Sequence, residues 1–219
     1  MMTPTLRRVT FTTHITFSVG WVGAAMAFLA LAVIGVTSED ERTVRGAYLV
    51  MAPAAWFVLV PLAHASLLSG IALSLGTTWG LFRHYWVVAK LLITVFATVI
   101  LLIYMGTFRQ MAGVAADPIV DLTLVRNASP IVHAILALIL LLGATVLGVY
   151  KPFGMTPYGE RKRDEQRQAV SATTSTRPGK ARAVDAGPTP WIYVAGIVAI
   201  AVVLLFVILH LTGETLTHH

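Results

Sequence analysis

The sequence has no cysteine and few charged side chains. The absence of cysteine excludes disulfides, thiolate metal ligands and cysteine nucleophiles. Charged residues make up 12% of the 219 residues, about half of the roughly 25% that soluble domains carry. Hydrophobic residues make up 57% of the chain. This composition indicates a membrane protein.

Carboxylates are absent from every long apolar run. All ten acidic residues fall in the polar segments outside these runs: Glu39, Asp40, Glu41, Asp117, Asp121, Glu160, Asp164, Glu165, Asp185 and Glu214. Because ion and proton pathways in membranes rely on buried carboxylates, a carboxylate-driven pump is disfavoured. The chain also has no Gly-rich phosphate loop, serine-nucleophile elbow or His-Glu-x-x-His pattern, so no catalytic constellation is evident.

Five apolar runs exceed the roughly 18 residues that mark a membrane-spanning helix. They cover residues 11–36, 48–75, 85–105, 130–150 and 191–211. Pro53 and Pro61 predict a kink in the second run. The predicted fold class is therefore all-α, a polytopic membrane helix bundle with five transmembrane helices.

The distribution of lysine and arginine predicts the orientation. If the N-terminus is cytoplasmic, twelve of the 16 basic residues lie on the cytoplasmic side. These are Arg7, Arg8, Arg83, Lys90, Lys151, Arg161, Lys162, Arg163, Arg167, Arg177, Lys180 and Arg182. Positive charge is enriched in cytoplasmic segments, so we expect the N-terminus inside and, after five spans, the C-terminus outside.

The chain divides into three parts by composition. Residues 1–155 form a four-helix membrane portion, and 190–219 hold the fifth helix with an outer tail. Residues 156–189 are rich in charge, Ser, Pro and Gly, which predicts a flexible basic cytoplasmic loop with a short helix near 160–169. Its mixed charge and lack of a folded module argue against nucleic-acid binding.

A short interfacial helix is expected near residues 118–126. Asp117 and the proline after it resemble a helix start, and Ile119, Leu122 and Val125 would share one face.

The first apolar run has two distinct faces. Small residues, which favour close helix packing in membranes, share one of them: Thr16, Gly20, Gly23, Ala27 and Ala30. His14 lies on the opposite face with Trp21 and Phe28, where we expect the lipid interface.

Lys90 is the one basic residue inside an apolar run. With no acidic partner available, we expect it to extend to the lipid headgroups. The alternative is that its stripe with Thr94, Ala97, Leu101 and Tyr104 faces the bundle.

Five histidines lie in or at the ends of the apolar runs: His14, His64, His84, His133 and His210. His64 is the deepest, roughly 15 Å from the end of its run at 1.5 Å per residue. A structural or interfacial role is the alternative interpretation for each of them. His218 and His219 end the chain and are left aside.

His133 and His210 fall at similar depth near the outer face. Two histidines on facing helices at one depth could hold haem b, and neutral imidazole also binds copper. His64 and His14 are further candidate cofactor ligands. Met105 and Met111 would lie on the same side as His133 and His210 and could add soft ligands to a copper site.

Two stretches resemble known membrane proteins. "SGIALSLGTTWGLFRHYWVVAKLLIT" (residues 69–94), and with it "HITFSVGWVGAAMAFLALAV" (residues 14–33), are similar to a group of uncharacterised bacterial integral membrane proteins. The stretch at residues 14–33 also resembles membrane domains of the copper-resistance D type, which open with a histidine before a WxGxx run. The resemblance implies a bacterial inner membrane, and its copper-type part would make His14 a ligand.

Three functions stay open. The first is a structural or accessory protein of the bacterial cytoplasmic membrane that is no enzyme and works in the lipid bilayer with a membrane-protein partner or a second copy. The second is a haem b or copper-binding protein. The third is a transporter or membrane enzyme of unknown substrate.

Overall fold

The computed structural model describes residues 2–77, 79–151 and 154–173, and these ranges fold almost entirely as helices. In chain order the elements are α1 (Pro4–Thr37), α2 (Glu41–Ala54), the π-helical segment η1 (Ala55–Leu59), α3 (Val60–Gly76), α4 (Tyr85–Ala116), the 3₁₀ turn η2 (Leu122–Leu124), α5 (Ser129–Tyr150) and α6 (Pro157–Thr173). The all-α class is confirmed for this part of the chain.

Four of the helical stretches are long and apolar enough to cross a membrane: Pro4–Thr37, Glu41–Gly76, Tyr85–Ala116 and Leu122–Tyr150. The chain is therefore a multi-pass membrane protein. The first four predicted runs are confirmed as helices, each with wider bounds. The fifth run, 191–211, lies outside the described residues.

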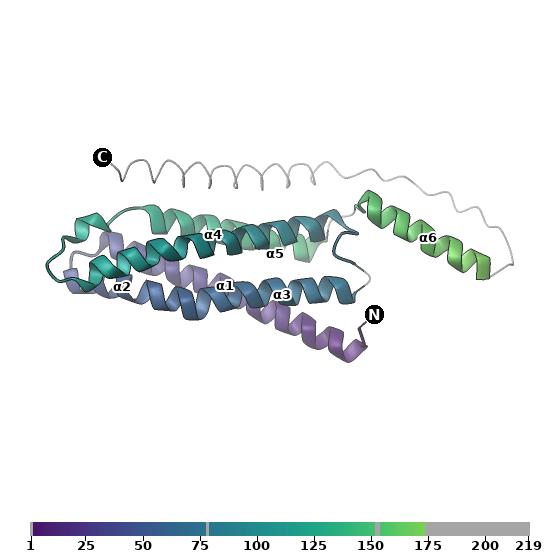
Figure 1. Ribbon diagram of the computed structural model, residues 1–219, viewed down its shortest axis with the longest axis horizontal. Coiled ribbons are helices and arrows are strands. Elements are labelled where there is room, and N and C mark those ends of the chain that lie inside the picture. The colour runs from purple at the N-terminus through teal and green to yellow at the C-terminus, as the bar shows by residue number, and fades with distance from the viewer. Residues whose placement is uncertain (1, 78, 152–153, 174–219) are drawn as a thin grey trace.

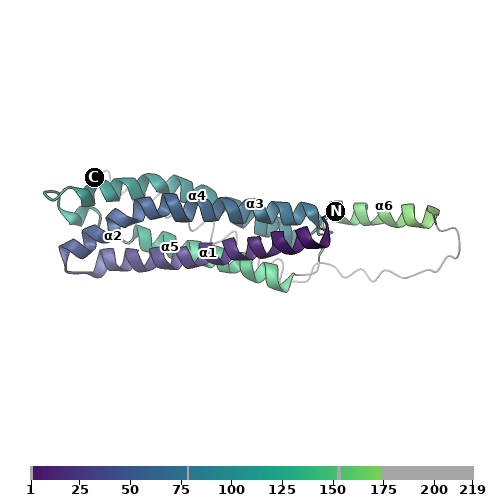
Figure 2. The same cartoon turned by 90° about the horizontal axis from the view of Figure 1, so that it is seen from below.

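The membrane-length helices run side by side as an elongated bundle, and α6 projects from the end of the bundle at which α1 begins (Figures 1 and 2). That end also carries Arg7, Arg8, Arg83 and Lys151, and we call it the basic end. The expected short helix near 160–169 is confirmed within α6.

The buried face of α1 is the reverse of the one expected. His14, Trp21, Phe28 and Gly35 recur every seven residues and are buried, as in the seam of a coiled coil. The small-residue face is largely exposed in the described part of the chain, and no atom lies within 4 Å of where a Cβ on Gly23 would stand. The large rings of Trp21 and Phe28 bury more apolar area and make more dispersion contacts, which determines the face that packs inward.

The aromatic core follows from this seam. The Phe28 ring meets Phe108 edge-on at 5.4 Å, and Tyr104 meets Phe108 at 4.9 Å between centroids. Tyr48 is completely buried, and its ring fills the space that the missing side chain of Gly35 leaves. Helices α1, α2 and α4 therefore interlock toward the end opposite the basic end.

Where a kink was predicted in the second span, the structure has the π-helical segment η1. Pro61 has no N–H for the carbonyl of Phe57 and its ring crowds that carbonyl. The helix widens just before the proline, where the N–H of Val60 donates to the carbonyl of Ala55, five residues back.

In the segment near residues 118–126 the structure has one 3₁₀ turn instead of the expected interfacial helix. The side chains of Asp117 and Asp121 accept the N–H groups two residues on, and such local bonds compete with helix formation. The guanidinium of Arg45 donates to four carbonyls of this segment and the end of α4: those of Ala115, Asp117, Pro118 and Val120. These bonds hold the segment against α2.

We predict that Gly35→Ala destabilises the protein. The new Cβ would stand 2.8 Å from Cζ of Tyr48, and overpacking of this kind typically costs about 1–3 kcal/mol. Thermal unfolding in mild detergent measures the loss. Gly23→Ala is the matched control on the same helix, and an equal loss in both variants would contradict the packing described here.

Candidate functional site

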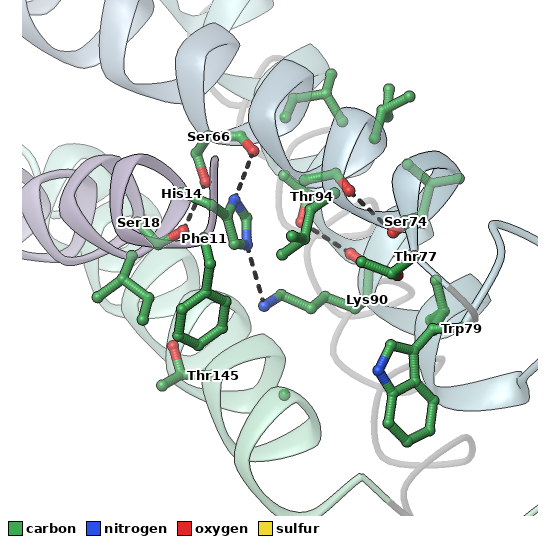
Figure 3. Close-up of a pocket in the computed structure, with 18 of the residues that line it drawn as sticks. Phe11, His14, Ser18, Ser66, Ser74, Thr77, Trp79, Lys90, Thr94 and Thr145 are labelled. Carbon is green, nitrogen blue, oxygen red and sulfur yellow. Dashed lines mark hydrogen bonds between the residues drawn. The ribbon is translucent and has the colours of Figure 1, made fainter. Parts of the chain in front are cut away.

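A cavity of about 460 Å³ lies between α1, α3, α4 and α5 at the basic end (Figure 3). Its polar lining comes from His14, Ser18, Ser66, Ser74, Thr77, Lys90, Thr94 and Thr145, with Arg7, Arg8 and Lys151 toward the end of the bundle. The rest of the wall is mostly apolar. No carboxylate lines it among the residues that the structure describes.

His14 joins α1 to α3 at the base of this cavity. It is 8% exposed, and its Nδ1 lies 3.1 Å from the carbonyl oxygen of Ser66 and 3.1 Å from Oγ of Ser69. A carbonyl can only accept, so Nδ1 carries the hydrogen and donates. In the neutral ring Nε2 is then an acceptor.

Lys90 of α4 supplies the donor for that acceptor. Its Nζ lies 3.4 Å from Nε2 of His14 and points into the cavity (Figure 3). The expectation that Lys90 extends to the headgroups is wrong, since its side chain crosses to α1 instead. Gly148 of α5 makes room for it, because a Cβ there would stand 3.1 Å from Nζ.

Hydroxyl groups complete the polar floor. Ser18 and Ser66 share a hydrogen bond of 2.9 Å between α1 and α3. Ser69 accepts from His14 and donates to the carbonyl of Ala65. His14 therefore acts as a donor to Ser69 and is not placed to take a proton from it.

The segment between α3 and α4 shapes the mouth of the cavity. Trp79 and Trp86 both line it, and their rings lie 5.5 Å apart. Nζ of Lys151, at the end of α5, lies 5.5 Å from the Trp79 ring, a cation–π distance. Thr156 donates to the carbonyl of Phe82, which ties the start of α6 to the same segment.

His64 does not join this cavity. Its side chain is exposed on α3, and Nδ1 donates to the carbonyl of Val60 in its own helix at 2.8 Å. The structure brings no other candidate histidine to it among the described residues.

His133 lies toward the opposite end, in the aromatic core. Its ring stacks on Tyr104 at 4.1 Å, and Nδ1 donates to the carbonyl of Ser129 at 2.8 Å. It lines a second cavity of about 80 Å³ with Trp21 and Phe28. His133 and His14 thus occupy separate cavities.

The predicted methionine ligands do not line the cavity beside His133. Met105 and Met111 are buried in α4, and neither is among the described residues that line the cavity beside His133. His210 lies outside the described residues. Within the described ranges, no group of three His, Asp or Glu side chains is placed to hold a metal ion.

Comparison of the chain with known protein families, with curated proteins and with solved structures finds no match in any of the three. The resemblance of residues 14–33 and 69–94 to bacterial membrane proteins stays a prediction.

Sequence reasoning identified His14 and missed its partners. The seven-residue recurrence of His14, Trp21 and Phe28 was the available signal that this face is buried. On α4 the signal was the stripe that Lys90 shares with Thr94 and Tyr104, both of which are buried. Nothing in the sequence indicated that Ser66 and Ser69 would meet His14.

The pairing of His133 with His210 is testable by spectroscopy. If it holds haem b, protein purified after expression with ample haem shows a Soret band that His133→Ala removes. His64→Ala is the matched control and keeps the band, since His64 faces away from the core. A colourless, metal-free protein after expression with ample haem and copper would contradict the prediction.

Proposed function

We propose that this chain is an accessory protein of the bacterial cytoplasmic membrane that binds an anion in the cavity at its basic end. One observation carries the proposal: Nζ of Lys90 points into a cavity that no described carboxylate lines.

The energetics of Lys90 favour an anionic ligand. An ammonium that leaves water loses several kcal/mol of solvation unless a partner compensates it. Lys90 is half-buried, so its ammonium group loses only part of this solvation free energy. A neutral imidazole occupies one of its three N–H groups, which leaves the remaining donors for a ligand. An anion 4 Å away would contribute about 4 kcal/mol at an effective dielectric constant of 20.

The surrounding groups fit binding better than catalysis. Arg7, Arg8 and Lys151 add positive charge at the mouth. The hydroxyls of Ser74 and Thr94 donate to carbonyls of their own helices, so His14 activates neither as a nucleophile. This arrangement supports a ligand-binding role.

We place the cavity on the cytoplasmic side, with the N-terminus inside and, after a fifth span, the C-terminus outside. The positive-inside rule supports this orientation. The basic end carries Arg7, Arg8 and Arg83 next to the basic residues of α6, whereas the opposite end carries the acidic run at residues 39–41. The resemblance to bacterial membrane proteins supports the choice of membrane. A membrane-protein partner or a second copy stays part of the proposal.

Lys90→Met tests the proposal, because methionine keeps the apolar stem and removes the charge. Thermal unfolding in mild detergent is measured with inorganic phosphate, glycerol phosphate and phosphatidylglycerol, against chloride. At least one of these anions should stabilise the wild type, and Lys90→Met should weaken its binding by at least about tenfold, since hydrogen bonds to charged groups contribute about 1.5–3 kcal/mol.

Lys162→Met is the control, since it removes a charge of α6 outside the cavity lining. It should keep the wild-type response. Equal responses of the wild type and Lys90→Met to every anion would refute the proposal.

A further inference from the structure

We infer that the anion is the phosphate headgroup of an anionic phospholipid, which enters the cavity sideways between α1 and α5. This inference rests on the proposed function and names its ligand.

The side of the cavity between α1 and α5 carries exposed apolar residues. Four apolar residues of these two helices line the cavity and are also exposed: Phe11, Ile15 and Val19 of α1, and Val149 of α5. Val19 is 65% exposed and Val149 is 70% exposed. In a bilayer, these side chains place this side of the cavity next to hydrocarbon. Figure 3 shows Phe11 pointing from α1 toward Thr145 of α5, so this side chain would turn aside for a lipid to enter.

The mouth lies at headgroup level. Trp79 and Trp86 line it, and tryptophan gathers at membrane–water interfaces. Arg7 and Lys151 line the same region, where basic residues attract anionic lipid. A phospholipid in the adjacent leaflet would therefore meet the cavity with its phosphate at this depth.

The cavity offers both charge and apolar surface, as a phospholipid requires. His14, whose Nε2 binds Nζ of Lys90, is seven residues from Arg7, so the two share one face of α1 about 10 Å apart along the helix. A phosphate bound to Lys90 would therefore lie on the side of α1 that carries Arg7. The wall at this level includes apolar side chains of α3 and α4, among them Leu67, Ile71 and Leu91. Such a wall suits acyl chains.

The inference is tested by filling the side of the cavity between α1 and α5 while Lys90 is kept. Val149→Trp fills the α5 side of the opening, and Ile15→Trp fills the α1 side. Val146→Trp is the matched control: Val146 is exposed on α5 and is not among the residues that line the cavity. Thermal unfolding without ligand shows whether each variant is folded. If one of Val149→Trp and Ile15→Trp is misfolded, the other is used for the test.

The full-length protein in mild detergent is offered phosphatidylglycerol, phosphatidylcholine and soluble glycerol phosphate, and retained lipid is counted by native mass spectrometry. We expect the wild type and Val146→Trp to retain phosphatidylglycerol over phosphatidylcholine. Val149→Trp and Ile15→Trp, which we call the gap variants, should reduce that retention at least about tenfold, and so should Lys90→Met.

Two other outcomes decide against the inference in different ways. If glycerol phosphate stabilises the wild type and the gap variants equally, while phosphatidylglycerol is not retained, the ligand is a soluble anion. The lipid inference then fails and the proposed function stands. If no anion distinguishes the wild type from Lys90→Met, both fail.

Discussion

A polar atom inside hydrocarbon must find its partner within the protein, and the rest of this structure depends on that constraint. Most polar side chains in the spans meet it locally, by bonding the carbonyl four residues back in their own helix. They include His64, Ser69, Ser74, Thr94, Thr98, His133 and Thr145. Lys90 uses a different solution: its partner, His14, lies on α1, and His14 in turn bonds to α3. One lysine thus connects three helices.

The two ends of the bundle are packed differently. Toward the end opposite the basic end, rings interlock around Phe108, and Arg45 fastens the connection after α4 to α2. At the basic end the helices leave a cavity, and hydroxyls replace rings in the contacts between α1 and α3. Because close packing at one end holds the helices together, the other end can retain a cavity without unfolding.

The sequence predicted those features that depend on local pattern. The apolar runs predicted the first four spans, whereas the lack of carboxylates led to the wrong expectation that Lys90 extends to the headgroups. The inward face of α1 was assigned wrongly, because the small-residue rule for membrane helices was weighed above the burial of Trp21 and Phe28. The partner of Lys90 could not be predicted from the sequence, since it depends on how three helices are placed in space.

The π-helical segment η1 marks a place where the second span can lose a residue without losing its register. A π turn holds one residue more than an α turn would in the same place, so deleting a residue within Ala55–Leu59 would restore α geometry. The helix after the deletion would keep its orientation, because the wide turn already absorbs the extra residue. A deletion between Val60 and Ser66 would instead turn everything after it by about 100°, the rotation of one residue in an α-helix, and Ser66 and Ser69 would face away from His14. Homologous chains that keep this cavity should therefore lose a residue of this span at η1 and not in the turns that follow it.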